Sequence, residues 1–305
     1  MADIVVVGSL NMDLVVKTPR IPVAGETIHG EDLRTIPGGK GANQAAAAVK
    51  LGSKVALVGR VGDDAFGPRL IDNLKQLGVN TNHVRIDAEA ATGTAIIIVN
   101  EGGENSIVVS PGANGRVAKE DIDRIDKLLD QAKYLLLQFE IPLETVQYAI
   151  EMASRKKMKV ILNPAPAKNV PPEILTKVDF LVPNETETKL LTGLEVKDLN
   201  SAEAAARKLA ELGISVVIIT LGEKGALLVT GNEAIHIPAQ KVKVVDTTAA
   251  GDAFIGSLAT ALVKGYALKD AVKYASCAGT LAVTKFGAQT SLPTLEEVEH
   301  LFKSY

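Results

Sequence analysis

The sequence predicts an α/β protein with a three-layer α/β/α arrangement: a mostly parallel central sheet between two layers of helices, and a small second sheet beside it. Three observations lead to this fold class. Short runs of β-branched residues alternate with helical patterns along most of the chain, which is typical of βαβ units. The 305 residues, 47% of them hydrophobic, are enough for one large domain spanning residues 1–305. Two stretches without a helical pattern, residues 13–37 and 94–110, interrupt the alternation.

The expected elements have recognisable ends. Thr294 followed by Glu297 predicts a capping box, and Gly52, Gly78 and Gly213 stand where helices should stop. Strands are expected at Ile4–Val7, Lys54–Val58, Tyr134–Leu137, Lys159–Leu162, Phe180–Val182, Val216–Thr220, Ala226–Val229, Glu233–Ile237 and Lys241–Val245. Helices are expected at Lys40–Leu51, Ala65–Leu77, Lys119–Gln131, Leu143–Ala153, Glu185–Leu191, Ser201–Leu212, Asp252–Lys264, Leu268–Thr284 and Thr294–Leu301.

The two interrupting stretches are the basis for the second sheet. Residues 13–37 and 94–110 contain strand-like runs joined by turns, with no helix between them. Both ribbons could simply extend the main sheet. We favour a separate small sheet that covers a cleft as a lid, or forms a dimer contact, because the first ribbon leads directly into a glycine cluster.

Composition and charge argue against several classes of function. The net charge is −3, the pI is about 5.9 and there is no basic run, so neither nucleic acid nor an anionic membrane is an expected partner. No apolar stretch approaches membrane-spanning length, and the first residues begin a strand and lack a signal peptide, so we expect a cytoplasmic protein. The single cysteine, Cys277, lies among small helical residues, where packing is its expected role.

The ten residues Val245–Phe254, VDTTAAGDAF, carry the strongest chemical signal. They are expected to join a strand to a helix through a turn of small residues. Ala249, Ala250 and Gly251 leave their backbone N–H groups open to a ligand, and such groups at a helix N-terminus bind anions. Asp252 follows at once. It is either a helix-capping or first-turn acid, or a base that takes a proton from a hydroxyl while the amides hold a phosphoryl group.

A glycine cluster opens the first expected helix. The segment Gly38–Ala45 has the sequence GGKGANQA, and its glycines permit positive φ and a close approach of a ligand to the backbone. Asn43 offers a donor and an acceptor, which suits a polyol. The pattern matches neither the dinucleotide-binding fingerprint nor the P-loop. A turn that binds no ligand is the alternative interpretation.

Polar residues follow the first strands at the edge where open α/β sheets bind ligands. Asn11 and Asp13 alternate in GSLNMD, so they share a face if the chain stays extended. Glu140 follows the strand Tyr134–Leu137 and reaches the same edge. A lone acid after a strand is also a common helix-capping residue, so Glu140 by itself decides nothing.

Two further segments have both a structural and a ligand-binding interpretation. Asn184 and Glu187 lie on one side of a first helical turn, where they form either a helix cap or a group that acts near Mg²⁺ through water. The turn Thr220–Gly225, TLGEKG, either holds the phosphates of a nucleotide or closes a hairpin.

Together and in this order, the motifs resemble the ribokinase family of sugar kinases. The matching segments span residues 8 to 291: GSLNMD, GGKGANQA, the strand that ends in Glu140, PNETE, TLGEKG, DTTAAGD and AVTKFGAQTS. GGKGAN and DTTAAGD are highly specific when found together at this separation. The resemblance implies a ribokinase-like fold with a lid, and transfer of the γ-phosphoryl group of ATP to a sugar hydroxyl. In the enzymes that give the family its name, this is the 5-hydroxyl of D-ribose.

The resemblance also implies roles for the residues that match the family's motifs. Asp252 would be the base, and the amides of Ala249, Ala250 and Gly251 the anion hole. The sugar would be bound by Asn11, Asp13, Gly39, Lys40, Asn43, Glu140 and Asp252. ATP would be bound by Asn184, Thr220, Gly222, Gly225, Gly251 and Ser276, with Glu187 near Mg²⁺ through water. A K⁺ ion would order the turn before Asp252, bound by Asp246, Thr248, Ala282, Lys285, Gly287 and Ser291, mostly through backbone carbonyls. A homodimer through the lid sheets is also implied.

Other functions stay open at this point. A related kinase could act on deoxyribose, another small sugar or a nucleoside. A nucleoside favours an aromatic wall, whereas the ribbons supply Ile28, Ile97, Ile98 and Ile107 and no aromatic residue. A non-catalytic sugar-binding protein would need neither Asp252 nor its small-residue turn, and a nicotinamide-dependent oxidoreductase would need the missing dinucleotide fingerprint.

Overall fold

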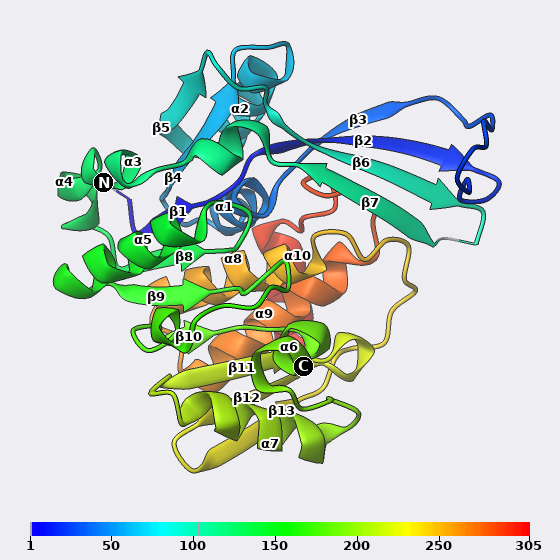
Figure 1. Cartoon of the computed structure of the whole chain (residues 1–305). Helices are drawn as coiled ribbons and strands as arrows, with labels where there is room; N and C mark the ends of the chain where they lie inside the picture. The colour runs from blue at the N-terminus through cyan, green and yellow to red at the C-terminus, as the bar shows by residue number, and fades with distance from the viewer. Residues whose placement is uncertain (1, 103) are drawn as a thin grey trace.

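The computed structural model describes residues 2–102 and 104–305, in which strands and helices alternate along the chain (Figure 1). Its strands are β1 (Ile4–Val7), β2 (Asn11–Thr18), β3 (Arg34–Gly38), β4 (Val55–Gly62), β5 (Asn80–Asp87), β6 (Gly93–Asn100), β7 (Asn105–Ser110), β8 (Tyr134–Leu137), β9 (Lys159–Leu162), β10 (Phe180–Leu181), β11 (Val216–Thr220), β12 (Ala226–Thr230) and β13 (Glu233–Ile237). Its α-helices are α1 (Lys40–Lys50), α2 (Phe66–Leu77), α3 (Lys119–Asp123), α4 (Asp126–Leu129), α5 (Leu143–Arg155), α6 (Glu185–Thr192), α7 (Leu199–Ala210), α8 (Ala250–Val263), α9 (Leu268–Ala282) and α10 (Leu295–Lys303). Short 3-10 turns occur at Gly112–Arg116, Pro172–Ile174 and Gly222–Lys224.

The main sheet has nine strands in the order β13-β12-β11-β10-β9-β8-β1-β4-β5. The pairs from β5 to β11 are parallel, and the pairs β11/β12 and β12/β13 are antiparallel. A large, mostly parallel sheet accompanied by a small second sheet is the fold class that the sequence predicts, and the structure confirms it.

Successive side chains of the central strands point to opposite faces of this sheet, and this places helices on both sides. On β1, Ile4 and Val6 pack in a cluster with buried residues of α1, α2, α8 and α9. Val5 and Val7 pack in a second cluster with residues of α3, α5 and α7. All four side chains are fully buried, as expected for a strand covered on both faces. Among the described residues, no helix combines the length and the apolar character needed to cross a membrane.

The strand order creates a crevice at one edge of the main sheet. The chain runs from β1 to β4 and β5 on one side, and later returns to β8 on the other side of β1. Such a reversal leaves space outside the carboxyl ends of the strands. The segments that follow β1, β8, β9 and β10 start at this edge and contain Ser9, Glu140, Asn163 and Asn184.

The two predicted ribbons form a sheet of their own, with the order β3-β2-β6-β7. This small sheet extends away from the layered body in Figure 1. β2 begins after only three residues that follow β1, so the small sheet is attached directly at the crevice. Residues 19–33, which belong to the first ribbon, contain no strand and are largely exposed.

Some predicted elements are wrong in detail. Residues 241–245 form no strand: their β-branched pattern has no neighbouring strand to pair with, and Val244 and Val245 are 57% and 55% exposed. The predicted helix Lys119–Gln131 is divided into α3 and α4, because Ile125 (φ −104°, ψ 15°) leaves helical geometry. β5 has no counterpart among the predicted strands, since it is a polar edge strand paired with β4.

Helices α1 and α8 pack closely because small residues face each other. A Cβ atom on Gly256 of α8 would stand 2.6 Å from the carbonyl oxygen of Gln44 and 2.7 Å from the Cβ of Ala47. This close approach brings Asn43 and Gln44 of α1 within hydrogen-bond distance of Asp252 at the start of α8. The helix packing therefore determines the geometry around Asp252.

We expect Gly256→Val to separate α1 from α8 and to destabilise the protein. The added side chain overlaps the α1 backbone, and overpacking of this kind costs roughly 1–3 kcal/mol, which lowers Tm by several degrees. Thermal unfolding measures the effect. Gly115→Ala is the control, because a Cβ atom there meets nothing closer than 3.6 Å. An unchanged Tm for G256V would contradict this account of the helix contact.

Candidate active site

Asp252 lies in the first turn of α8, and only 5% of its surface is exposed. Asn43 Nδ2 donates a hydrogen bond to its Oδ2 (2.9 Å), and Gln44 Nε2 donates to its Oδ1 (3.0 Å). The N-cap residue of α8 is Ala249, and its side chain makes no capping hydrogen bond. Asp252 is therefore not the helix cap. It is a buried first-turn carboxylate, stabilised by the helix dipole and by two amide donors.

Lys40 is the cation that balances a group of acids around Asp252. Burial raises the pKa of Asp252, while Lys40 and the two amide hydrogen bonds act in the opposite direction. Burial also acts to lower the pKa of Lys40, but the attraction of Asp252, Glu140, Glu187 and Asp13 outweighs it, so this pKa is raised. Lys40 therefore stays positively charged at neutral pH.

The turn before α8 presents backbone amides next to Asp252. Ala249 has a positive φ of 59°, which directs the chain into the helix at Ala250. Ala249 and Gly251 border a cavity of about 190 Å³ together with Asp252. Apart from its chain neighbours and its own helix backbone, no described heavy atom lies within 4 Å of the position that a Cβ atom would take on Gly251, so its backbone is open on that side. The Ala250 amide instead donates to the Thr247 carbonyl at 3.3 Å.

This small cavity lies between the carboxyl ends of the strands and the first turns of α1, α6 and α8. Its polar border includes Lys40, Asn163, Asn184, Glu187, Thr220 and Thr247. Asn184 caps α6 through its Oδ1, which accepts from Glu187 N (2.8 Å), and the Glu187 carboxylate accepts from Asn184 N (2.8 Å). The pair is thus a capping box that also borders the cavity.

The acids at this cavity suit a metal ion that is coordinated mainly by water and phosphate oxygens and needs few ligands from the protein. The described residues contain no group of three or more histidines, cysteines and acids arranged to hold a metal. Mg²⁺ binds phosphate oxygens and waters readily and needs few direct protein ligands. Glu187, whose pKa is raised mainly by burial, is the acid that stands nearest to that role.

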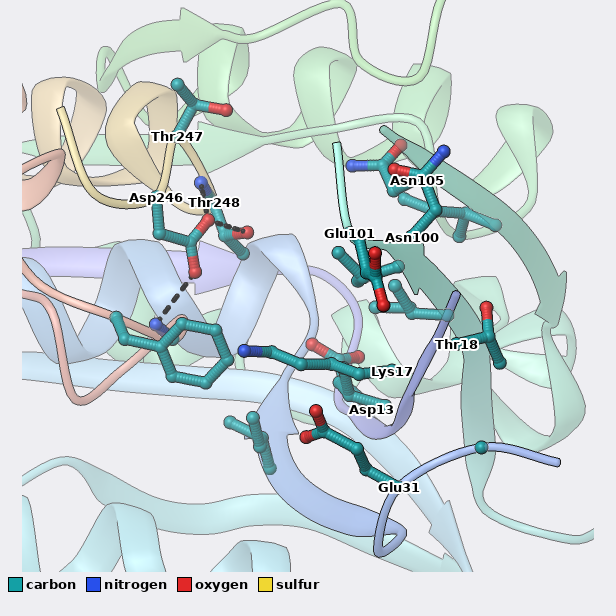
Figure 2. A pocket seen from close by; sticks show the side chains of 18 of the residues that line it. Asp13, Lys17, Thr18, Glu31, Asn100, Glu101, Asn105, Asp246, Thr247 and Thr248 are labelled. Atoms are coloured by element: carbon teal, nitrogen blue, oxygen red, sulfur yellow. Dashed lines mark hydrogen bonds between the residues drawn. The ribbon is translucent and has the colours of Figure 1, made fainter. Parts of the chain in front are cut away.

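A larger cavity of about 880 Å³ lies between the small sheet and the main body (Figure 2). Asp13, Lys17 and Asn100 border it from the small sheet, and Thr247 and Thr248 border it from the turn before α8. Thr247 borders the small cavity as well, so the turn before α8 lies against both cavities.

Asp13 is the acid of the larger cavity. Within the described chain, no hydrogen-bond donor contacts its carboxylate, which is 9% exposed. A Cβ atom on Gly38 would stand 2.3 Å from Asp13 Oδ2, so the glycine at this position leaves room for the carboxylate. Burial and the charges of Glu140 and Asp252 raise the pKa of Asp13 from its ordinary value of 3.8 to about 7.

Asn11 and Glu140 are held in place by hydrogen bonds within the fold. Asn11 Oδ1 accepts from Asn114 Nδ2 at 2.7 Å. Glu140 Oε2 accepts from Ser9 Oγ (2.5 Å) and from the backbone N–H of Lys40 (3.0 Å). Glu140 therefore joins the ends of β1 and β8 to the first turn of α1.

The residues implied as K⁺ ligands lie on the turn before α8 and on the loop after α9. Asp246 connects the two segments, because its Oδ1 accepts from Thr248 N (2.9 Å) and its Oδ2 accepts from Gly287 N (2.9 Å; Figure 2). The Lys285 ammonium pairs with Glu297 (2.6 Å), which leaves only the carbonyl of Lys285 as a ligand. The full set is Asp246, Thr248, Ala282, Lys285, Gly287 and Ser291. Its carboxylate, hydroxyl and carbonyl oxygens fit a monovalent cation.

Comparison with known proteins gives one consistent result. Residues 1–295 match the pfkB family carbohydrate kinase. The chain is 43% identical over 296 residues to a deoxyribokinase of Salmonella typhi, with 97% of each chain covered. It is 42% identical over 312 residues to a ribokinase of Schizosaccharomyces pombe, with 99% of this chain and 98% of that protein covered. The chain belongs to the pfkB family of carbohydrate kinases.

The solved structures of ribokinases agree with this membership. The structure of Arabidopsis thaliana ribokinase, described as complexed with ribose and ATP, has a TM-score of 0.93 at 35% identity, and 99% of each chain is covered. Together with the relatives, it confirms the family that the motifs indicate, and this chain is a kinase of the ribokinase type.

Three residues that the motifs assign to ATP binding in this kinase do not border either cavity. Ser276 is buried within α9 and 6% exposed. Gly222 and Gly225 form the turn after β11. A Cβ atom on Gly225 would stand 2.1 Å from the Ile237 carbonyl oxygen, so the hairpin itself requires glycine there.

Other residues of the site have no role in the sequence predictions. Gln44, Gln138 and Asn163 form a line of buried amides behind Asp252. Gln44 belongs to GGKGANQA, but nothing in that motif shows that two adjacent side chains reach the same carboxylate. Phe286 borders the larger cavity from the loop after α9 and supplies an aromatic ring that the predicted ribbons lack.

The raised pKa of Asp13 predicts a pH-dependent cost in stability. Between pH 3.8 and about 7 the folded protein holds a proton that the unfolded chain releases, so the free energy of unfolding falls as the pH rises through this range. Asp13→Asn removes the cost, and we expect its Tm at pH 8 to exceed that of the parent by about 3 °C or more. The difference should shrink as the pH falls towards about 4.

Thermal unfolding of the ligand-free proteins across this pH range measures the effect. Asp72→Asn is the control, because the side chain of Asp72 is 65% exposed. A difference between D13N and the parent that is the same at every pH would contradict the assigned cause.

Proposed function

We propose that this kinase transfers the γ-phosphoryl group of ATP to the 5-hydroxyl of D-ribose. One observation carries the proposal: Asp252 borders the small cavity beside the amides of Ala249 and Gly251, and Thr247 of the same turn borders both cavities. A phosphoryl donor in one cavity and an alcohol in the other would meet at this carboxylate. The relative from Arabidopsis thaliana, described with ribose and ATP, supports the pairing of substrates.

Two polar groups of the site suit a small polyol: the Asp13 carboxylate in the larger cavity, and Asn43 Oδ1, which borders neither cavity but lies beside Asp252. The Asp13 carboxylate has two oxygens without a donor in the described chain, which can accept from two adjacent hydroxyls of one sugar. Asn43 Oδ1 is buried and has no partner among the described residues, so a sugar hydroxyl that donates to it is favoured. The remaining proposed sugar contacts are Asn11, Gly39, Lys40, Glu140 and Asp252.

In the proposed reaction, Asp252 accepts the hydroxyl proton as the hydroxyl oxygen forms its bond to the γ-phosphorus. The bond between this phosphorus and the β,γ-bridging oxygen breaks, and ADP leaves. Lys40 and the amides of Ala249 and Gly251 stabilise the negative charge on the transferring group, which is the main contribution that a protein makes to such a transfer. The Ala250 amide, predicted as part of the same anion hole, would have to give up its bond to the Thr247 carbonyl to join them. The proposed nucleotide contacts are Asn184, Thr220, Gly222, Gly225, Gly251 and Ser276.

We propose Mg²⁺ and K⁺ as the cations of this site. Mg²⁺ would come with the nucleotide, near Glu187 through water, and would neutralise phosphate charge. K⁺ would be held by the oxygens of the turn before α8 and the loop after α9, and its charge would strengthen the anion site. Asp246 already joins these two segments through its hydrogen bonds to Thr248 and Gly287.

The small sheet is proposed to act as the lid and as the contact between two copies of the chain. It borders the larger cavity, so its closure would exclude water from the transferring group. β7 is an edge strand with six exposed residues, among them Val108 at 64% exposure. Edge strands with exposed apolar residues pair readily with another chain.

The first test replaces the proposed base. Asp252→Asn keeps the shape of the side chain but cannot take a proton, so we expect turnover to fall roughly 10²–10⁴-fold while ribose binding is largely kept. ADP release measures turnover, and titration calorimetry with ribose measures binding. A variant that retained most of its turnover would remove Asp252 from this role.

The second test asks which sugar is the substrate, since a deoxyribokinase is among the relatives. D-Ribose, 2-deoxy-D-ribose and adenosine are compared by ADP release at equal concentration. If Asp13 accepts from two adjacent hydroxyls, loss of the 2-hydroxyl costs about 1.5–3 kcal/mol, and kcat/KM for deoxyribose falls roughly 10–100-fold. Equal values for the two pentoses would favour a deoxyribokinase. A preference for adenosine would favour a nucleoside kinase in which Phe286 packs against the adenine ring.

A further inference from the structure

A line of buried carboxamides runs from the end of β8 to Asp252. Gln138 Nε2 donates to Gln44 Oε1 at 2.6 Å, and Gln44 Nε2 donates to Asp252 Oδ1 at 3.0 Å. The same Gln44 nitrogen lies 3.5 Å from Asn163 Oδ1, and Asn163 Nδ2 donates to the Val182 carbonyl at 3.0 Å. Gln44 and Gln138 have no exposed surface, so these contacts form without competition from solvent.

The groups at the two ends of this line fix the direction of each amide. An ionised carboxylate can only accept, so Gln44 presents its NH₂ group to Asp252 and its carbonyl to Gln138. The Val182 carbonyl also only accepts, so Asn163 presents its own carbonyl to Gln44. The NH₂ group and the oxygen of Gln44 are then all in use. Gln44 keeps no polar group with which it could contact a ligand.

Asn43 holds the second oxygen of Asp252 in a different way. Its Nδ2 donates to Asp252 Oδ2 at 2.9 Å, but its own Oδ1 is buried and unpartnered among the described residues. An unpartnered buried acceptor costs about 1–3 kcal/mol, so Asn43 gains from a substrate hydroxyl that donates to its Oδ1. Asp252 Oδ2 therefore lies next to the Asn43 amide, whose oxygen can still accept from a substrate hydroxyl. Oδ1 lies next to the Gln44 amide, whose polar groups are all in use within the fold.

We propose that Gln44, oriented by Gln138, is a positioning residue that holds Asp252 Oδ1 and leaves Oδ2 to take the proton of the sugar hydroxyl. The inference deepens the proposed function and depends on Asp252 being the base. Gly8 at the end of β1 belongs to the same arrangement, because a Cβ atom there would stand 2.1 Å from Gln138 Oε1 and would displace the amide.

The hydrogen bond from Gln44 also acts on the charge of Asp252. The charged groups that face this carboxylate from the surrounding elements are Lys40 on α1, Asp13 on β2, Glu140 after β8 and Glu187 on α6. Burial and the three other acids oppose ionisation of Asp252, whereas Lys40 and the amide donors favour it. Removing the Gln44 donor leaves the charges in place and shifts the balance towards the protonated form.

The test is Gln44→Met, which keeps the length of the side chain and removes the donor. We expect the acidic limb of the kcat/KM profile to move up by about one pH unit, because activity requires ionised Asp252. At a pH below the acidic limb of the parent we expect kcat to fall roughly 10-fold, with recovery at a pH above the limb of the variant and a ribose KM within about 3-fold of the parent. Gln138→Met leaves the bond to Asp252 but frees the Gln44 amide, and should shift the limb in the same direction by less.

A control separates positioning from a general loss of buried polar contacts. Thr145→Val removes a buried hydrogen bond on α5, from the Thr145 hydroxyl to the Val117 carbonyl (2.8 Å), at a residue that borders neither cavity, and should leave the limb in place. The proposal is overturned if kcat falls by the same factor at every pH in Q44M and Q138M while the acidic limb of the kcat/KM profile stays at the pH of the parent. Unchanged kinetics in both variants overturn it as well.

A readout without turnover keeps the inference separate from the proposed function. In the free protein, the ¹³C NMR titration of the Asp252 carboxyl should have a higher midpoint in Q44M, or in Q138M if Q44M does not fold, than in the parent. Equal midpoints overturn the positioning role even if the parent phosphorylates ribose. A parent that phosphorylates no sugar, or an active D252N, overturns the proposed function, and the titration then still tests the contact.

Discussion

The packing of α1 against α8 is the contact on which the rest of the site depends. The amide groups that hold Asp252 come from residues 209 and 208 positions earlier in the chain. They reach the carboxylate because Gly256 and the alanines of α1 allow the helices to approach closely. A buried carboxylate is costly unless it is hydrogen-bonded, so the same contact that places Asp252 also makes its burial tolerable.

The acids of the site come from separate parts of the fold, and one cation balances them. Asp13 comes from the small sheet, Glu140 from the end of a central strand, and Glu187 and Asp252 from the first turns of two helices. Their mutual repulsion disfavours ionisation, and Lys40 offsets part of it. Such an arrangement suits the binding of hydroxyls and cations better than it suits stability, because in the free protein the repulsion between the acids is reduced by Lys40 alone.

The sequence predicts the parts of the fold that depend on local pattern. Strands such as Ile4–Val7 and Tyr134–Leu137 have the predicted bounds, since each is a continuous apolar run that is buried over most or all of its length. Residues 241–245 have a strand pattern but no partner strand, and pairing is not visible in a local pattern. The polar ends of the strands do meet at one crevice, as the topology of parallel sheets requires. Gln138, Asn163 and Phe286 could not be predicted, because their roles arise only from contacts between distant segments.

In the proposed closure of the small sheet as a lid, the short connection between β1 and β2 would be the pivot. Asn114 holds this connection in place: its side chain accepts a hydrogen bond from Leu10 N and donates to the Leu10 carbonyl and to Asn11 Oδ1. In such a closure, the displacement of a residue would grow with its distance from this connection. Thr18 lies seven residues, or about 23 Å, beyond Asn11. Asp13, two residues beyond Asn11, would therefore move little, whereas the far end of the small sheet would move most. The part of the larger cavity around Asp13 would then have its shape before the proposed lid closes.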